Sequence, residues 1–486
     1  MPRFPAPAPT AAHVAVCEHC DQCCAVPPLA RGQVARCPRC QLALDRHERL
    51  GPREMLAICL TAVVAFVLAN AYPLVTLEVQ GMARQASLLQ AIAVTWQQPG
   101  LWGVALMALL TAFVLPLAQL LLLLGLLLML MRQRVPPGFE VATRWLRGFR
   151  PWSMVPVFVL GVLVAIIKMA DMATIIVGVG LWSMAALVLL LTLLARLDAR
   201  TLWRYAEETG AAHANPRRLT AGQHGHRLLA CEVCGFVHDL DAADGPGPGP
   251  GAAGQGRALR CARCGSRMHR RKPDSLARTW AFLLTGLLLY LPANLLPIMR
   301  TTGLLDDSQH TILGGVVELW RGGAPDIAIV VFVASIAVPL VKFVVLVMLL
   351  LAVQGSQRGL DAAAAPATGV RRLWAFALGR SAAADPARDR LARARLYRFV
   401  EFIGQWSMLD VFVVLLLAAL VNFQGLMQVS AGFGALAFGL TVAATMVAAM
   451  SFDPRLIWDA PPLSPGCGPT PTPNTTPGEE VHARAG

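Results

Sequence analysis

Long apolar runs separated by short polar segments dominate this chain. A helix needs about 20 mainly apolar residues to cross a bilayer, because the hydrocarbon core is about 30 Å thick. The pattern predicts an all-α polytopic membrane protein with two tandem four-helix transmembrane modules. The eight predicted spans are Met55–Pro73, Leu101–Met131, Trp152–Ile176, Val177–Ala195, Thr279–Met299, Ile327–Gln354, Phe402–Val421 and Gly432–Ala449.

The second span of each half is longer than a crossing requires and contains a proline, Pro116 or Pro339. Proline lacks the N–H of a regular helix and clashes with the preceding turn. We therefore expect both helices to be tilted, kinked or extended beyond the bilayer.

Several short motifs occur twice, once in each half and in the same order. Because both halves would begin and end on the same side of the membrane, they are parallel repeats and not inverted ones. The matching pairs are Asn70-Ala71-Tyr72-Pro73 with Asn294-Leu295-Leu296-Pro297, Trp96 with Trp320, Trp152-Ser153-Met154 with Trp406-Ser407-Met408, and Asp198-Ala199-Arg200 with Asp453-Pro454-Arg455.

Basic residues gather in alternate loops. Arginines flank the first, second, fourth and fifth spans on one side and fill the loop after the sixth, whereas segments 74–100 and 300–326 contain few. Positively charged loops remain in the cytoplasm. The rule places both termini and both cysteine-rich segments there.

Composition agrees with a membrane protein, since 56% of the residues are hydrophobic and 15% are charged. The formal charge of +13 could indicate nucleic-acid binding. However, no basic stripe is interleaved with aromatic residues, and cytoplasmic arginines explain the charge. We expect no nucleic-acid partner.

Each half opens with two CxxC pairs. Four thiolates at this spacing can close a tetrahedral Zn²⁺ site, and a closed shell is structural because no position remains for a substrate. The predicted ligands of two structural zinc sites are Cys17, Cys20, Cys37 and Cys40 in the first half, and Cys231, Cys234, Cys261 and Cys264 in the second. The first segment also offers His19, Cys23 and Cys24 as ligands, and a redox-active dithiol is the alternative chemistry.

Charged residues inside the last four spans are candidates for function, because charge in a bilayer is energetically expensive. Lys342 and Asp410 each stand alone in an apolar run, and we expect them to pair. Helical spacing places Ser335 and Ser407 on the same faces, and Thr445 could join from the eighth span. The alternative is a static ion pair that only orients helices.

The first half lacks this cluster, since Gln119 and Pro156 stand opposite Lys342 and Asp410. Instead, Lys168 and Asp171 lie three residues apart on one helical face of the third span. They are a second candidate pair, although near the end of a span a lysine can reach the interface without any function.

The expected domain order follows from these segments. The ends of the chain, residues 1–14 and 460–486, are expected to be disordered, and residues 206–226 to form a linker. Zinc ribbons cover 15–48 and 227–272, the second with a Gly/Pro-rich insertion. The transmembrane modules cover 49–205 and 273–459, the second with a cytoplasmic insertion at 355–395.

The duplicated cysteine pairs, four-span modules, Trp-Ser-Met and Asn-x-x-Pro motifs together resemble the paraquat-inducible protein A family. The resemblance covers residues 15–460, nearly the whole chain. It implies zinc ribbons on the cytoplasmic face of a Gram-negative inner membrane. It also implies lipid trafficking with a periplasmic tunnel protein built from mammalian-cell-entry (MCE) domains. The resemblance further marks the polar cluster of the second half as a functional centre, for example a proton-responsive relay.

Motifs for nucleotide-driven or hydrolytic chemistry are not found: there is no GxxxxGK[ST], HExxH or GxSxG. We therefore expect a transport component and not an enzyme. One alternative is a scaffold that anchors the periplasmic partner without a transport cycle of its own. Another is a cytoplasmic metal or redox sensor that uses the cysteines.

Overall fold

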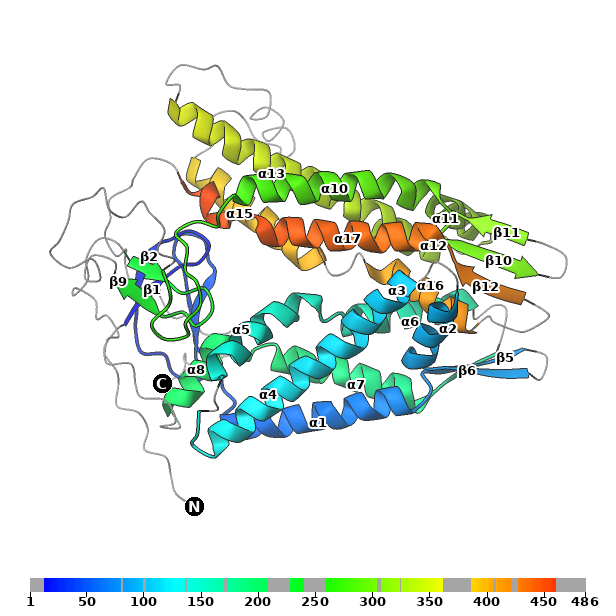
Figure 1. The fold of residues 1–486 in the computed structure, drawn as a ribbon, viewed down its shortest axis with the longest axis horizontal. Helices are drawn as coiled ribbons and strands as arrows, with labels where there is room; N and C mark the ends of the chain where they lie inside the picture. The colour runs from blue at the N-terminus through cyan, green and yellow to red at the C-terminus, as the bar shows by residue number, and fades with distance from the viewer. Residues whose placement is uncertain are drawn as a thin grey trace, which may run out of the picture.

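The fold is a bundle of long helices with small β-structures at both ends, seen in a computed structural model (Figure 1). The structure describes residues 13–79, 82–98, 102–135, 138–169, 174–208, 228–239, 259–303, 307–323, 325–361, 386–404, 408–420 and 427–459. The predicted disordered tail, the Gly/Pro-rich run and most of the 355–395 insertion lie outside these residues.

Two small cysteine-bearing units form one end of the molecule. The first Cys ribbon, residues 13–48, consists of the hairpins β1 (His13–Val16) with β2 (Cys23–Val26) and β3 (Val34–Arg36) with β4 (Ala43–Arg46). The second Cys ribbon, residues 228–239 and 259–272, pairs β8 (Leu228–Ala230) with β9 (Val237–Asp239) and closes its other turn by the bridge Arg260–Arg267. Both ribbons lie together at the left of Figure 1.

The N-terminal half, residues 49–208, forms helices on the predicted apolar runs and also on the segments between them. Its helical elements are α1 (Pro52–Ala71), α2 (Leu88–Gln97), α3 (Trp102–Ala108), η1 (Leu109–Val114), α4 (Leu115–Met131), α5 (Phe139–Phe149), η2 (Arg150–Trp152), α6 (Val155–Met169), α7 (Val179–Leu194) and α8 (Ala199–Glu208). Among these, α1 packs along α4 and α7.

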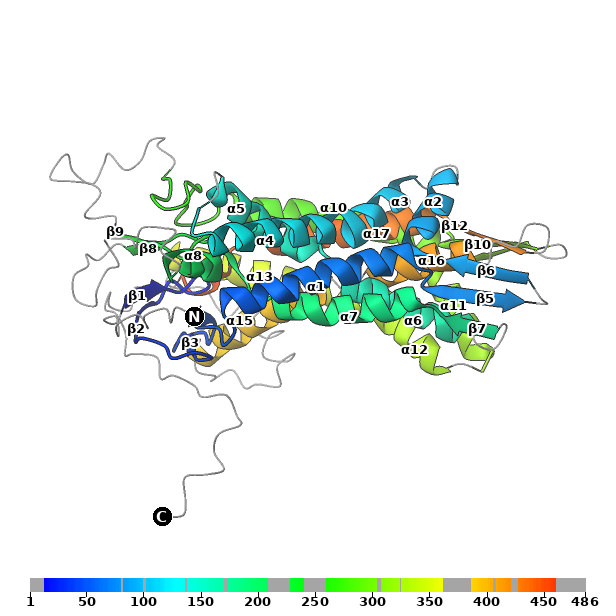
Figure 2. The ribbon, with the colours of Figure 1, turned by 90° about the horizontal axis from the view of Figure 1, so that it is seen from below.

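The C-terminal half, residues 273–459, has a matching order of elements. It contains α10 (Ser275–Leu295), α11 (Ile312–Arg321), α12 (Pro325–Phe332), η4 (Val333–Ala337), α13 (Val338–Asp361), α15 (Pro386–Ile403), α16 (Leu409–Leu420), α17 (Phe433–Ser451) and η6 (Pro454–Ile457). Here α10 packs along α17. The halves lie side by side and run between the two ends of the molecule (Figures 1 and 2).

Six helical segments of the described residues are long and apolar enough to cross a membrane. They are Pro52–Ala71, Trp102–Met131, Phe139–Ile167, Ser275–Leu295, Ala328–Gly355 and Phe433–Ser451, and the bent pair Val179–Leu194 with Ala199–Glu207 could supply a seventh. The seventh predicted span, Phe402–Val421, is represented by the 12-residue α16. The described structure thus supports six crossings directly, where the hydrophobic pattern predicts eight.

The all-α prediction is wrong at the end opposite the ribbons. Three-stranded antiparallel sheets project there, ordered β6 (Met82–Ala86), β5 (Val75–Val79), β7 (Thr174–Val177) and β11 (Asp307–His310), β10 (Met299–Gly303), β12 (Met427–Ala431). The third predicted span ran to Ile176, but α6 ends at Met169 and Thr174–Val177 forms β7. An apolar, β-branched strand next to a helix cannot be separated from a longer span by hydropathy alone.

The repeated Asn-x-x-Pro motifs fix the junction between helix and sheet in both halves. Gly180 N donates to Pro73 O at 3.2 Å, and Gly434 N donates to Pro297 O at 3.1 Å. A Cβ on Gly178 or Gly432 would lie about 2 Å from these proline carbonyls, so the backbones approach too closely for any side chain. The repeat found in the sequence is therefore a repeat of structure.

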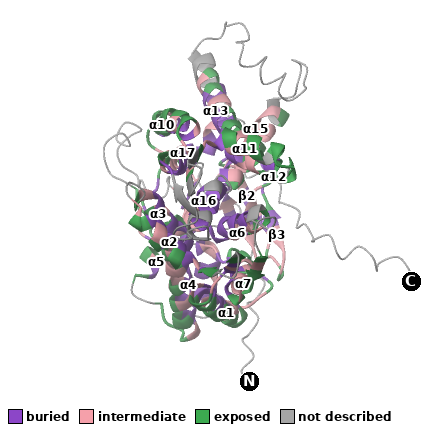
Figure 3. Cartoon of the chain, turned by 90° about the vertical axis from the view of Figure 1, so that its right-hand side faces the viewer, coloured by how far each residue is buried: buried purple, intermediate pink, exposed green. Residues whose placement is uncertain are grey.

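The two halves meet through α6 and α16, which pack against each other in the middle of the molecule. Phe158 and Phe412 make an edge-to-face contact with ring centroids 5.5 Å apart. Viewed from the sheet end, buried residues gather in this central region and exposed ones surround it (Figure 3). Many exposed side chains on the long helices are leucines, such as Leu189 and Leu288, as expected of a lipid-facing surface.

Candidate functional site

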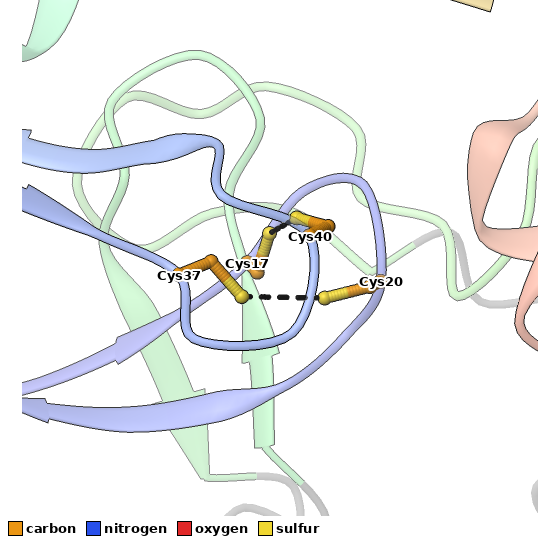
Figure 4. Close-up of side chains that lie close together, drawn as sticks. All are labelled: Cys17, Cys20, Cys37 and Cys40. Carbon is orange, nitrogen blue, oxygen red and sulfur yellow. Dashed lines mark hydrogen bonds between the residues drawn. The ribbon is translucent and has the colours of Figure 1, made fainter. Parts of the chain in front are cut away.

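The first cysteine cluster lies between the tips of the two hairpins of the first Cys ribbon (Figure 4). The Sγ atoms of Cys17 and Cys40 are 3.4 Å apart, and those of Cys20 and Cys37 are 3.5 Å apart. All four side chains are buried, and their ligand atoms lie within 4.8 Å of one another.

The second cluster has the same construction in the second Cys ribbon. The Sγ atoms of Cys231 and Cys264 are 3.5 Å apart, and those of Cys234 and Cys261 are 3.6 Å apart. These four ligand atoms also lie within 4.8 Å of one another.

Each CxxC turn ends in a residue with left-handed backbone. In the second ribbon these residues are Gly235 and Gly265, with φ of 73° and 63°, whereas Asp21 and Gln41 occupy the equivalent positions in the first. The turn directs backbone N–H groups back toward the cysteines, as in the bond from Asp21 N to Cys17 O at 3.0 Å. The spacing therefore folds into a turn that presents two thiols to the same point.

Four buried thiols gathered at one point suit a tetrahedral, closed-shell metal site. Hydrogen bonding with Cys17 is the largest cause that lowers the pKa of the Cys37 thiol, and it raises the pKa of Cys20. Both clusters could therefore hold a metal ion, and the donor set is the one that Zn²⁺ favours. Of the alternative ligands in the first ribbon, His19 packs its ring against Tyr397 instead.

Two groups next to the second cluster were not found from the sequence. Ser266 Oγ lies 3.1 Å from Cys231 Sγ and 3.0 Å from Cys264 Sγ, and His238 Nε2 lies 3.4 Å from Cys261 Sγ. A serine two residues after the last cysteine and a histidine on β9 carry no motif that would distinguish them. Such neighbours orient metal ligands in many sites.

The repeated Asp-x-Arg motifs attach the ribbons to the helical halves. Arg455 is 4% exposed; its Nη2 donates to Glu232 Oε1 at 2.8 Å, its Nε to Glu18 O at 3.0 Å and its Nη1 to Arg270 O at 3.0 Å. One guanidinium thus holds both ribbons.

The equivalent arginine of the first half acts on the first ribbon. Arg200 pairs with the Glu18 carboxylate and donates from Nη1 to Leu44 O at 3.0 Å. Arg147 of α5 lies between the two ribbons, 3.9 Å from Glu18 Oε2 and 3.6 Å from Glu232 Oε2. Arg147, Arg200 and Arg455 thus connect the ribbons to each other and to the helical halves. The sequence showed the Asp-x-Arg repeat without indicating this role.

The second candidate site is a buried lysine in the C-terminal half. Lys342 of α13 is 1% exposed, and its Nζ donates to Thr445 Oγ1 of α17 at 2.9 Å. Among the described side chains, no carboxylate lies within ion-pairing distance of this ammonium group. Gly286 of α10 lies against the Thr445 side chain, so three helices enclose the contact.

The other predicted members of the polar network are placed less fully. Ser335 is completely buried, and its Oγ donates to Val331 O at 2.6 Å. Asp410 lies on α16 and Lys168 on α6, but the side chains of both fall outside the described part of the structure. Ser407 and Asp171 lie outside the described residues altogether. The structure therefore brings Lys342 and Thr445 together and leaves the roles of the remaining residues as predictions.

Both proline-bearing helices contain a π-helical turn just before the proline. η1 precedes Pro116, and η4, which contains Ser335, precedes Pro339. Met154 N donates to Thr111 O in η1 at 3.2 Å, so the Trp-Ser-Met motif satisfies a carbonyl of this turn. π-turns often mark functional positions in helices.

The family model described as Paraquat-inducible protein A matches residues 53–207 and 276–461. Intermembrane transport protein PqiA of Escherichia coli (strain K12) is 33% identical over 458 residues, covering 92% of this chain and 96% of that protein. Lipophilic envelope-spanning tunnel protein A of the same strain is 30% identical over 446 residues, covering 91% of each.

A more distant relative is the Probable intermembrane transport protein of Haemophilus influenzae (strain ATCC 51907 / DSM 11121 / KW20 / Rd). It is 28% identical over 450 residues, covering 91% of this chain and 95% of that protein. No solved structure matches the chain.

Proposed function

Because this chain belongs to the paraquat-inducible protein A family, we propose that it is the inner-membrane component of an intermembrane lipid transport system. It loads lipids into, or extracts them from, a periplasmic tunnel partner built from MCE domains. The names of two relatives, an intermembrane transport protein and an envelope-spanning tunnel protein, support this assignment.

We further propose that the chain crosses a Gram-negative inner membrane eight times, as two tandem modules with both termini in the cytoplasm. The ribbons and the sheets lie at opposite ends of the helices, as this topology requires (Figure 1). Trp96 and Trp320, at the sheet end, are 51% and 58% exposed, as interfacial tryptophans usually are. The proposal includes the domain boundaries expected from the sequence, with zinc ribbons at 15–48 and 227–272 and transmembrane modules at 49–205 and 273–459.

The sheet end is the side available to a periplasmic partner. The sheets of both halves project beyond the helices there and have the same strand order. Two similar surfaces side by side suit a partner that must be seated over the membrane domain.

The burial of Lys342 is the observation that best supports a transport cycle. A lysine buried between transmembrane helices, with a threonine hydroxyl as its described partner, is costly to keep charged. A static structural contact could be replaced by apolar packing at little loss. We propose that Lys342 and Asp410, with Ser335, Ser407 and Thr445, respond to protons and couple them to lipid movement, and that Lys168 and Asp171 form a secondary pair.

The ribbons have a structural role in this account. Each closed set of four cysteines holds one Zn²⁺ that folds a unit too small to build its own core. The protein acts as a transporter component and not as an enzyme.

Envelope-barrier function in the host, deleted for this chain and complemented by variants, tests the proposal. We expect Lys342→Ala and Asp410→Asn to lose the barrier while folded protein accumulates at the wild-type level. Gln119→Leu is the matched control, because Gln119 occupies the position of Lys342 in the first half and is likewise buried. A barrier that survives both substitutions would favour the scaffold and refute the transport cycle.

A further inference from the structure

An open groove lies on the N-terminal half between α5 and the preceding long helix. It has a volume of about 580 Å³ and is walled by Leu110 and Leu115 on one side. Trp145, Gly148, Phe149 and Trp152 of α5 and η2 form the other side. We call it the α4–α5 groove. Sites of a few hundred to a thousand Å³ commonly hold a small organic ligand.

Among the described residues that line the groove, Arg144 alone is charged. Its Nε donates to Glu140 O at 3.2 Å, and among the described residues its terminal Nη groups have no partner. The next arginine of α5, Arg147, is paired with the ribbon carboxylates. The terminal nitrogens of Arg144 can therefore donate to an anion from outside the chain.

The aromatic side chains give the groove its second property. Trp145 is 56% exposed and makes an edge-to-face contact with Phe149, with centroids 5.3 Å apart. Exposed aromatic rings beside a basic group are typical of the membrane interface, where an apolar surface meets a polar headgroup. The groove therefore offers an apolar wall and one anion-binding group.

The Arg144 side of the groove lies toward the ribbon end of the molecule. The α5 helix begins against the second ribbon, where Glu140 comes close to Gly265, and Arg144 follows Phe139 by about 8 Å along the helix axis. In the proposed topology the Arg144 side lies on the cytoplasmic side, whereas Leu115 stands about 24 Å along its helix from Met131 at the ribbon end. Across the groove, Leu110 belongs to the π-turn η1.

We propose that the α4–α5 groove binds one phospholipid of the cytoplasmic leaflet, with its phosphate on Arg144 and an acyl chain along Trp145, Phe149 and Trp152. This inference rests on the proposed lipid transport and adds the site at which the N-terminal half takes up lipid. Guanidinium groups bind phosphate oxygens strongly, which is why the occupant is a phosphate-bearing lipid.

Two substitutions test the groove without disturbing the fold: one fills it, and the other removes its charge. A Cβ at Gly148 meets no atom within 4 Å, so Gly148→Leu fills the groove, whereas Gly125→Leu on α4 meets equally open space outside it. Arg144→Gln removes the charge, and Arg132→Gln removes an exposed arginine elsewhere. Replacing a helical glycine also favours the helix, so loss of folding is not expected.

The experiment uses the purified full-length chain in vesicles that contain a phosphatidylglycerol or phosphatidylethanolamine probe with a photoreactive acyl chain. We expect labelling of the 145–152 segment to fall about tenfold in both variants, because Gly148→Leu fills the groove and Arg144→Gln removes the charged donor to phosphate. The two controls should label like wild type. A diacylglycerol probe, which has no phosphate, should label the segment weakly.

If diacylglycerol labels the segment as strongly as the phospholipid probe, or if Gly148→Leu labels like wild type, the label comes from lipid that surrounds the protein unspecifically. Either result would refute the proposed lipid site in the groove. The barrier assay on the wild-type chain separates this result from failure of the proposed function. A working barrier without specific labelling refutes only the groove, whereas specific labelling without any effect on the barrier refutes the transport role.

Discussion

At the scale of single residues, Arg455 shows how one side chain can hold two small domains. It reaches a carboxylate and two backbone carbonyls from both ribbons, and its side chain is almost fully buried. Lysine could supply the charge but not three directed donors in one plane. The planar guanidinium is therefore required at this position.

We predict that Arg455→Ala loosens both ribbons, with a loss of about 2–3 kcal/mol in their docking, because Glu232 and two carbonyls lose their donor. Arg455→Lys should recover only part of this. Hydrogen exchange of segments 13–48 and 259–272 measures the change. The account is contradicted if exchange in both ribbons stays at the wild-type rate.

The Lys342–Thr445 contact makes a second prediction at this scale. Thr445→Val removes the described acceptor of the Lys342 ammonium and should impair the envelope barrier, whereas Thr445→Ser should retain it. Thr441→Val is the matched control: Thr441 lies one turn earlier on α17, is equally buried, and donates only to Ala437 O. If the two valine variants behave alike, the hydroxyl on Lys342 has no special role.

The candidate residues differ in how visible they are in the sequence. Lys342 stands alone in an apolar run, and the cysteines follow a metal-binding spacing, so both could be predicted. Arg144 could not, because it lies among many loop arginines and only the structure shows which of them are paired. Ser266 and His238 became visible only when folding brought them beside the cysteines.

At the scale of helices and strands, the packing of α6 against α16 joins the two halves. Gly161 permits this contact, since an added Cβ would lie 3.1 Å from Phe412 Cβ and 3.6 Å from the Leu409 carbonyl oxygen. The position thus has no room for a larger side chain. Its neighbourhood contrasts with that of Gly125, which faces open space.

We predict that Gly161→Leu destabilises the protein by about 1–3 kcal/mol through overpacking, whereas Gly125→Leu leaves stability unchanged or slightly raised. The midpoint of thermal unfolding of purified protein in detergent provides the measurement. Equal midpoints for the two variants would show that α6 and α16 are not closely packed in solution.

Element prediction from the sequence was accurate where apolar runs are long and failed where they are composite. The long runs at Pro52–Ala71 and Ser275–Leu295 appear as single helices. By contrast, the run ending at Ile176 divides into α6 and strand β7, because Thr174–Val177 pairs with β5. Counting apolar residues does not reveal that such a segment can form a strand. The proline positions were informative, although the π-turns before them could not be foreseen.

At the scale of the whole molecule, the repeat has kept its architecture while its chemistry has diverged. Both halves share the strand order of their sheets, the π-turns and the glycine–proline contact. The first half nevertheless has Gln119 at the position equivalent to Lys342. The α4–α5 groove lies on the N-terminal half. We therefore assign lipid uptake to the first half and coupling to the second.

The ribbons make a prediction about metal content. The full chain should contain two Zn²⁺ per molecule, and Cys40→Ser or Cys264→Ser should reduce this to one, because each breaks one set of four ligands. Elemental analysis of purified protein tests this, with protease sensitivity of the ribbons as the second readout. Release of the metal by mild chelator, or reversible thiol oxidation, would instead support a sensor.

The central claim is that this chain moves lipids between membranes through a cycle that needs Lys342. The direct measurement is the exchange of pulse-labelled phospholipid between separated inner and outer membranes of the host deleted for this chain. Wild type and Gln119→Leu should restore exchange, and Lys342→Met, which keeps the side-chain volume without the charge, should fall to the level of the deleted strain. Exchange that is equal with and without the chain, or that is normal in Lys342→Met, would contradict the account.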